Sequence, residues 1–385
     1  MRRWTARRVN KGGCTAENLY VHFPFCRRKC AYCALCSSAG STPEERAAHV
    51  ERAVSAVAGS RIAPPSALKT VYFGGGTPAL CDLRPFRGMF PRDAEFTVEL
   101  HPLDVTGETL DTLKAIGVNR ISLGVQSFCD ATLASMRRLH TSAEAAAAFR
   151  RIREAGFENA GLDLIAGWPG DCAALDSAKR AVDLGAVHVS VYSLIVEPGT
   201  ALAKGIGLPL QPDDAVLDAI AEIRDCLASV GIMRYEVSNY AKPGFECRHN
   251  LAVWRGEDYL GIGPGAYSRV GRERWHTVRC GKCGWRRSGV ASPGPVEDAR
   301  ERAIFALRLA EGLDLSRAER LFVPSSAGGD SRRSETAAWK ALLDSWEAHL
   351  DALVAPGIVR RLSARRYALT DRGFEVCDAV SADLP

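Results

Sequence analysis

The chain has 385 residues, of which 46% are hydrophobic and 25% are charged, and its net charge is +5. These values are typical of a globular protein that is long enough for one large core and a smaller second domain. A net charge this small gives no argument for a nucleic-acid partner, and we expect none.

The sequence contains no apolar run near the roughly 20 residues that span a bilayer, so peripheral contact is the one membrane association left open. Its first residues, MRRWTARRVNKGG, are basic but lack the apolar stretch of a secretory signal. Thirteen cysteines is a high count. Without an export signal we expect a cytoplasmic protein whose clustered cysteines are metal ligands or reactive thiols rather than disulfides.

Short apolar runs alternate with amphipathic segments over the first 240 residues. The first predicted strand, LYVHF, leads into a cysteine-rich segment. A helix should begin after Thr42, because Pro43 suits the first helical turn and Glu45 is placed for a capping box. The later predicted elements are strands TVYF (70–73), FTVEL (96–100), RISLGV (120–125), GLDLIAG (161–167) and VSVYSLI (189–195), and helices after Ser142 and over 213–230.

This alternation predicts an α/β fold with a parallel sheet covered by helices. Six strand–helix units would form a partial (β/α)6 barrel, an open relative of the eight-unit TIM barrel. Functional residues of such barrels lie at the C-terminal ends of the strands. We place this core, with the extension that follows it, at residues 18–290.

After residue 290 the pattern changes, and we expect an α-rich, winged-helix-like second domain over 291–385. It should contain helices over 297–311 and 335–352, a polar insertion at 323–334, and a hairpin in GIVRRLSARRYALT. The hairpin carries Arg360, Arg361, Arg365 and Arg366. No aromatic or base-reading pattern accompanies them, so a solvated hairpin is favoured over a nucleic-acid face.

Cys26, Cys30 and Cys33 form a CxxxCxxC motif directly after the first predicted strand. Thiolates are the usual ligands of iron–sulfur clusters, which normally take four. Three ligands on one loop therefore predict a 4Fe-4S cluster with one iron open to an external chelator. Cys36 is interpreted as a spare thiol, because a fourth cysteine ligand would close that iron.

The strand TVYF ends in the motif GGGTP, Gly74–Pro78. Consecutive glycines expose backbone N–H and C=O groups and let a ligand approach closely. The motif lacks the GK[ST] ending of a phosphate-binding loop. Its place at the second strand end, facing the cysteine loop, makes it the expected partner for the amino group of the external chelator.

With these motifs, the sequence resembles radical S-adenosylmethionine (SAM) proteins, in the branch that contains oxygen-independent coproporphyrinogen III oxidase and the HemW-type haem chaperones. In radical SAM proteins the amino and carboxylate groups of SAM chelate the open iron. The resemblance extends over nearly the whole chain, through ELHP (99–102), GVNRISLGVQSF (117–128), RRLH (137–140), LDLIAGWPG (162–170), SLIVEPGT (193–200), RYEVSNYAKPGFECRHN (234–250) and YLGIGPGAYS (259–268).

The resemblance also implies roles for individual residues. It assigns SAM contacts to positions on the first five strands and the loops that follow them, and it implies no catalytic residue. An arginine suits a carboxylate, and a carboxylate suits an ammonium group or ribose hydroxyls. The implied SAM contacts are Tyr20, Tyr32, Gly75, Gly76, Thr77, Glu99, Gln126, Arg138 and Asp163.

Within this branch, three features favour the haem chaperones. First, Leu35 stands where the oxidase has a fourth cysteine. Second, only 19 residues precede Tyr20, whereas the oxidase has a longer N-terminal segment. Third, HNLAVW resembles the chaperone motif HNxxYW, and its His249 is a candidate axial haem ligand. The expected ligand is then haem, and the expected partners are haem-accepting respiratory proteins. An oxidase acting on a porphyrinogen remains the alternative, and whether the chain is an enzyme stays open.

Several positions depart from the family pattern, namely Leu35, His101, Val253 and Tyr267. The segment RERWHTVRCGKCGWRR (272–287) has no family counterpart that we recognise and contains Cys280 and Cys283 as CxxC. A single CxxC is weak evidence for zinc. We interpret the segment as a basic surface loop, with arginines facing porphyrin propionates as the alternative.

Overall fold

The structure is a computed structural model that describes residues 16–59, 67–171, 173–205, 207, 209–280, 284–322 and 330–385. The basic N-terminal segment, most of the predicted polar insertion and Cys283 lie outside these residues. Among the described helices, none has the length and apolar composition needed to cross a membrane.

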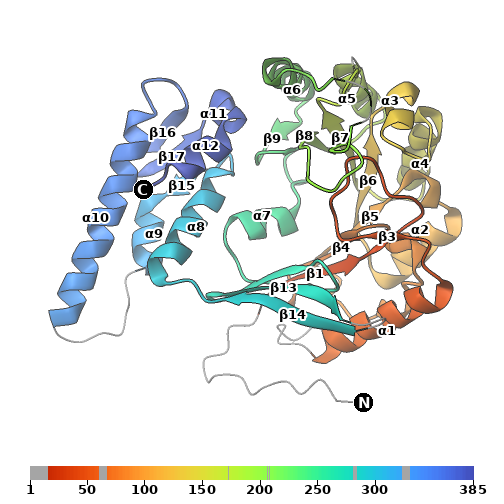
Figure 1. Ribbon diagram of the computed structural model, residues 1–385, viewed down its shortest axis with the longest axis horizontal. Helices are drawn as coiled ribbons and strands as arrows, with labels where there is room; N and C mark the ends of the chain where they lie inside the picture. The colour runs from red at the N-terminus through yellow and green to blue at the C-terminus, as the bar shows by residue number, and fades with distance from the viewer. Residues whose placement is uncertain are drawn as a thin grey trace.

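The central element is a parallel sheet that contains all six predicted strands, which confirms them. Each strand pairs with the next in chain order, so the chain winds in one direction around the barrel (Figure 1). The six strands are β1 (Asn18–Phe23), β4 (Thr70–Gly75), β5 (Glu95–Leu100), β6 (Arg120–Gln126), β7 (Asn159–Ala166) and β8 (His188–Ser193).

Further strands extend this sheet at both edges to twelve. Beside β1 lie β11 (Tyr259–Ile262), which is parallel to it, and then antiparallel β12 (Tyr267–Val270), β13 (Glu273–Cys280) and β14 (Gly284–Ala291). Beside β8 lie β10 (Asn239–Ala241) and β9 (Met233–Arg234).

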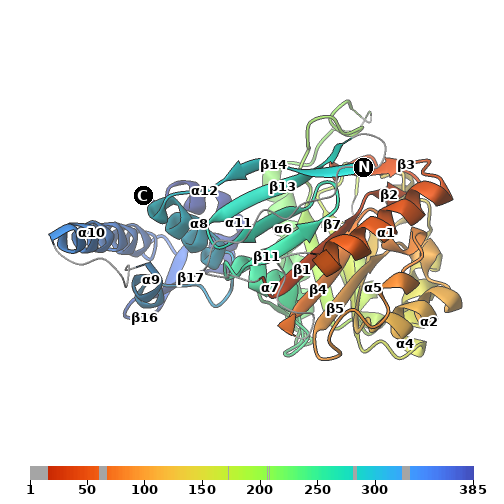
Figure 2. The ribbon, with the colours of Figure 1, turned by 90° about the horizontal axis from the view of Figure 1, so that it is seen from below.

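The interpretation of 272–287 as a surface loop was wrong, because most of this segment forms the β13–β14 hairpin. Alternate side chains of β13, those of Trp275 and Thr277, are buried, and this period-2 pattern belongs to a strand with one covered face. The hairpin reaches α1 (Figure 2). There the rings of Trp285 and His49 pack at a tilt, with 4.9 Å between their centroids.

Helices and short turns connect the strands. Thr42 and Glu45 form the predicted reciprocal cap, with Thr42 N donating to Glu45 Oε2 at 3.1 Å and Glu45 N donating to Thr42 Oγ1 at 3.2 Å. The helices are α1 (Pro43–Gly59), α2 (Gly107–Ile116), α3 (Asp130–Ser135), α4 (Ser142–Glu154), α5 (Ala174–Asp183), α6 (Asp213–Ala228) and α7 (Arg248–Trp254). Short elements are β2 (Phe25–Cys26), β3 (Ser38–Ala39), and the 3-10 turns η2 (Pro78–Leu80), η3 (Arg84–Phe86) and η4 (Pro102–Asp104).

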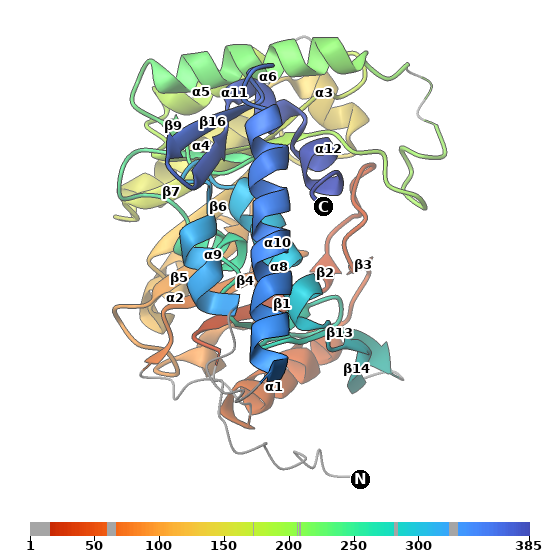
Figure 3. The ribbon, with the colours of Figure 1, turned by 90° about the vertical axis from the view of Figure 1, so that its left-hand side faces the viewer.

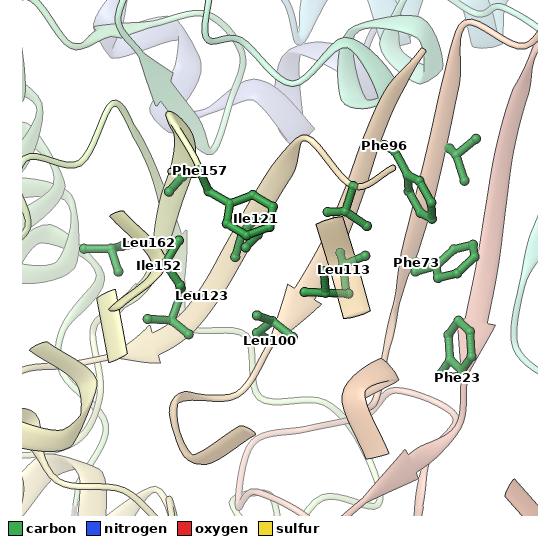
Figure 4. Packing of buried hydrophobic residues seen from close by; sticks show 14 of the residues in the cluster. Phe23, Phe73, Phe96, Leu100, Leu113, Ile121, Leu123, Ile152, Phe157 and Leu162 are labelled. Atoms are coloured by element: carbon green, nitrogen blue, oxygen red, sulfur yellow. The ribbon is translucent and has the colours of Figure 1, made fainter. Parts of the chain in front are cut away.

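The main core lies between the sheet and these helices. Phe23, Phe73 and Phe96 come from successive strands and pack with ring centroids 5.1 and 4.8 Å apart, as Figure 4 shows. Because side chains alternate along a strand, the residues between the core positions, such as Tyr72 and Glu99, face the barrel interior. The apolar face of each strand therefore packs against the helices, and the polar face lines the interior of the barrel.

The C-terminal segment has its own hydrophobic core, which includes Leu343, Trp346 and Tyr367. Its helices and hairpin lie beside the barrel in Figure 1, and Figure 3 views them from their own side. The two predicted helices and the hairpin are present, whereas the winged-helix likeness and the division at residue 290 stay predictions. The elements are α8 (Pro295–Leu307), β15 (Leu313–Asp314), α9 (Leu315–Phe322), α10 (Asp330–Ala352), β16 (Val359–Ser363), β17 (Arg366–Leu369), α11 (Asp371–Glu375) and α12 (Cys377–Ala382).

Two arginines of the β16–β17 hairpin form ion pairs with carboxylates of α10 in the same C-terminal segment. Arg361 contacts Glu347 and Asp351, each at 3.2 Å, and Arg365 contacts Glu347 at 3.1 Å. Carboxylates of α10 thus neutralise charge that a nucleic acid would otherwise meet.

Candidate functional site

The three cysteines lie on the loop between β1 and α1, which neighbouring loops hold in place. Ala31 N donates to Met136 O at 3.0 Å, and Leu202 N donates to Ala31 O at 2.8 Å. Cys26, Cys30 and Cys33 are partly buried, and none of the described cysteines is in a disulfide. All three thiols are therefore available as ligands.

A cavity of about 450 Å³ opens at the C-terminal ends of the parallel strands, where barrel folds place their sites. Its wall brings together eleven of the residues named from the sequence, which come from the cysteine loop, from the strands β4 to β7 or the turns after them, and from the loop after α3. These are Cys26, Cys30, Tyr32, Cys33, Gly75, Gly76, Thr77, Glu99, Gln126, Arg138 and Asp163.

The glycine motif approaches the cysteine loop too closely for any larger residue. Gly76 N donates to Phe23 O and Thr77 N to Phe25 O, both at 2.7 Å. A Cβ atom at Gly76 would lie 2.4 Å from Phe25 O and 2.7 Å from Phe23 O. Gly75 has φ +104°, a conformation that favours glycine. These contacts join the two motifs into one wall of the cavity.

We expect Gly76→Ala to lower the free energy of unfolding by about 1–3 kcal/mol, because the backbone around Phe25 must move. Thermal unfolding of the apo-protein measures this effect. Gly107→Ala is the matched control, since a Cβ there meets nothing within 4 Å. Equal unfolding midpoints for the two variants would contradict the close approach.

Glu99 is the central carboxylate of the cavity. Tyr72 Oη donates to its Oε1 at 2.8 Å, and Gly75 N donates to its Oε2 at 2.9 Å. Burial raises the pKa of Glu99 to about 7, and the Asp163 carboxylate adds to the rise. The carboxyl group therefore titrates near neutrality, and a cationic ligand would favour its ionised form.

Asp163 lies two strands away, on β7. Ser122 Oγ donates to its Oδ1 at 2.9 Å. Burial raises the pKa of Asp163 as well, against the hydrogen bonds from Ser190 and Ser122. Two carboxyl groups in one enclosed space make this part of the cavity suited to a ligand with positive charge or several hydroxyl groups.

Arg138 connects the cysteine loop to the strands. Its Nη1 lies 3.3 Å from Cys30 Sγ, and its Nη2 donates to Gly124 O. Its Nε is buried without a hydrogen-bond partner, which is costly unless a ligand accepts from it. Gln126 and Arg137, with φ of +74° and +59°, are the non-glycine residues with positive φ in the described ranges, and both line the cavity. Such backbone strain is typical of functional sites.

Tyr20 is the one predicted SAM residue that does not line the cavity. Its hydroxyl group donates to His22 Nδ1 at 3.0 Å, and His22 Nε2 donates to Cys36 O at 2.8 Å. The carbonyl oxygen can only accept, so this chain of hydrogen bonds runs from Tyr20 to the end of the cysteine loop. Tyr20 supports the loop from inside the barrel, and its contact with SAM stays a prediction.

Sequence reasoning missed a pair of histidines beside Arg138. His101 lines the cavity, its Nδ1 accepts from Leu103 N at 3.2 Å, and its Nε2 lies 3.4 Å from His140 Nδ1. Burial lowers the pKa of His101 to about 2 and that of His140 to about 4, with the Arg138 charge as a further cause. The only signal in the sequence was that His101 departs from the family pattern.

His249 lies at the other end of the barrel. Its Nδ1 is 2.8 Å from Thr70 Oγ1, at the first residue of β4, and its backbone N donates to Glu95 at 3.0 Å. The side chain is buried, and burial lowers its pKa to about 3. These contacts join α7 to the start of the sheet, which favours a structural role for this histidine.

The donor set fits an iron–sulfur cluster better than a single metal ion. No three His, Cys, Asp or Glu side chains in the described ranges are grouped closely enough for one ion. A 4Fe-4S cluster spreads its cysteine ligands over separate irons. Cys26, Cys30 and Cys33 would hold it, and Gly75, Arg138 and the two carboxylates would hold SAM.

Comparisons with known proteins identify the relatives of this chain. The family model described as the radical SAM superfamily matches residues 20–174. A heme chaperone HemW from Mycobacterium tuberculosis is 34% identical over 371 residues, which are 90% of this chain and 92% of the relative. The HemW of Bacillus subtilis is 37% identical over 306 residues, 74% of this chain and 79% of the relative.

Among solved structures, coproporphyrinogen III oxidase (HemN) from Escherichia coli superimposes with a TM-score of 0.76. The match covers 96% of this chain and 90% of that chain, at 20% sequence identity. An identity this low informs on the fold alone, and it confirms the predicted α/β fold class.

Proposed function

The chain belongs to the HemW family of radical SAM proteins, and from that premise we propose that it binds haem and delivers it to haem-dependent proteins. The observation that carries this proposal is similarity to curated haem chaperones over nine-tenths of the chain. Haem-containing respiratory proteins are the acceptors that we propose.

Superfamily membership implies a 4Fe-4S cluster and SAM. In this proposal the thiols of Cys26, Cys30 and Cys33 bind the cluster, and the cavity beside them binds SAM. What supports it is the geometry of the wall, where the unpartnered Arg138 Nε and the carboxyl groups of Glu99 and Asp163 share one enclosed space with the thiols. The group bound there supplies redox chemistry, and these residues position it.

The first test is a haem titration of the anaerobically reconstituted protein, followed by visible absorbance. We expect saturable binding of one haem per chain, because a carrier must hold its cargo in a defined site. Absence of saturable binding would overturn the carrier function. Formation of decarboxylated products from coproporphyrinogen III and SAM would then support the oxidase alternative.

The same haem titration tests His249, which the sequence suggested as an axial haem ligand. Its ring is buried against Thr70 and Tyr72, with 5.2 Å between the ring centroids of His249 and Tyr72. We therefore expect His249→Ala to lower the unfolding midpoint while the folded fraction still binds haem. Complete loss of haem binding at unchanged stability would instead support axial ligation.

A further inference from the structure

We propose that haem lies across the mouth of the cavity, with its macrocycle against Leu35, Leu139 and Ile195 and its propionates directed to Arg28 and Arg137. This inference rests on the proposed haem binding and adds its location. We call these five residues the rim. They come from three segments that are distant in sequence, and all five line the cavity.

The apolar part of the rim is unusually exposed. Leu35 is 52% exposed, Leu139 is 40% exposed and Ile195 is 66% exposed. Large aliphatic side chains gathered at the edge of one cavity typically mark a surface for an apolar ligand. The face of a porphyrin macrocycle is such a ligand.

The three segments are held together by the backbone. The cysteine loop, which carries Leu35, bonds to the segment before Arg137 through Ala31 N and Met136 O. It also bonds to the segment after Ile195 through Leu202 N and Ala31 O. In Figure 1 the red loop that follows β1 lies beside the green loop that follows β8. The rim is therefore a preformed surface.

The cations of the rim have no carboxylate partner among the described residues. Arg28 donates only to the carbonyl oxygens of Arg137 and Arg138, at 2.8–3.0 Å, so its charge stays uncompensated. The exposed side chain of Arg137 has no hydrogen bond or ion pair within the described ranges, and its backbone is held at φ +59°. Neighbouring Arg27 differs, because it is paired with Asp104.

Two guanidinium groups without carboxylate partners in the described ranges, beside the apolar part of the rim, match the chemistry of haem, which has an apolar plane and two carboxylates on one edge. Arginine is well suited to pair with carboxylates. The same position would place haem over the opening of the cavity. Bound haem should then slow the release of a ligand from inside it.

The experiment compares haem affinity of the cluster-loaded wild-type protein with that of Arg137→Asn and Ile195→Asn. Asn tolerates the positive φ at residue 137, so the first variant removes the charge without adding strain. We expect each variant to weaken haem binding roughly tenfold. Matched controls are Arg360→Asn and Leu362→Asn, exposed residues on the β16–β17 hairpin, which should leave haem affinity unchanged.

A second ligand separates the two parts of the rim. The dimethyl ester of haem lacks the propionate charges, so Arg137→Asn should not weaken its binding, whereas Ile195→Asn should. Equal weakening of haem and its ester by Arg137→Asn would refute the propionate pairing. SAM should also leave the haem-loaded protein several times more slowly than the haem-free protein.

The outcomes of this experiment separate the proposed position of haem from the proposed haem-carrier function. A wild-type protein that binds haem saturably, with both rim variants unchanged, overturns the location and leaves the proposed function standing. A wild-type protein that binds no haem overturns both. Circular dichroism and cluster content of each variant, compared with the controls, show that a change in affinity does not come from misfolding.

Discussion

Replacement of Cys26, Cys30 or Cys33 by Ala is expected to abolish the 4Fe-4S cluster. Each thiolate would hold a different iron, so one deletion leaves two of the three proposed protein ligands for four irons. The measurement is iron and sulfide content after anaerobic reconstitution, with the visible charge-transfer absorbance. We expect loss of nearly the whole cluster in each single variant.

Cys36→Ala is the matched control, because Cys36 lies on the same loop but is exposed. Its carbonyl oxygen accepts from His22, and this bond survives a change of side chain. We expect a full cluster in this variant. Full iron and sulfide in any of the other three variants would contradict the ligand assignment, and a lost cluster in Cys36→Ala would identify a fourth ligand.

Replacement of Glu99 by Gln should weaken SAM binding and strengthen the fold. The variant keeps the shape but removes the charge that a cationic ligand would meet. Loss of a charge-assisted hydrogen bond should lower the affinity for SAM roughly 10- to 100-fold. Calorimetric titration of the cluster-loaded protein with SAM measures this change. Unchanged affinity would exclude Glu99 from the SAM site.

The effect of the same variant on stability depends on pH. The pKa of Glu99 is 4.5 in a model compound and about 7 in the fold, so the carboxyl group ionises more readily when the chain unfolds. Wild-type stability therefore falls as the pH rises from about 4.5 to about 7, by about 3 kcal/mol, and then stays level. Gln does not ionise, and Tyr72 Oη can turn from donor to acceptor.

Thermal unfolding of the apo-proteins at pH 5 and pH 8 tests this dependence. The advantage of Glu99→Gln over wild type should be small at pH 5 and large at pH 8. Glu158→Gln, at an exposed position, is the control and should track wild type at both pH values. A wild-type protein that is more stable than Glu99→Gln at pH 8 would show that the buried charge is stabilising here.

Local patterns in the sequence determined the barrel and the site. Apolar runs such as TVYF and FTVEL are strands because their alternate residues, among them Phe73 and Phe96, must leave water. Parallel strands bring their C-terminal ends to one edge, and the cysteine motif and the resemblance to radical SAM proteins named residues near those ends. Eleven of these residues line one cavity.

Contacts between segments that are distant in the sequence could not be predicted from local patterns. The strand β11 pairs with β1 across some 240 residues, and no local pattern specifies that neighbour. The β13–β14 hairpin was mistaken for a loop because its arginines suggested a solvated face, while Trp275 and Trp285 pack on the sheet and on α1.

The sequence by itself thus predicted the strands and the cysteine motif, because apolar alternation and motif spacing are local, and its resemblance to radical SAM proteins predicted the SAM contacts. The tertiary structure alone decided burial and partners. It placed Tyr20 behind the cysteine loop and His249 at the far end of the barrel, and it set His101 against His140. Within the described part of the chain it also left Arg28 and Arg137 without carboxylate partners, beside exposed aliphatic side chains, since charge compensation depends on neighbours that only folding supplies.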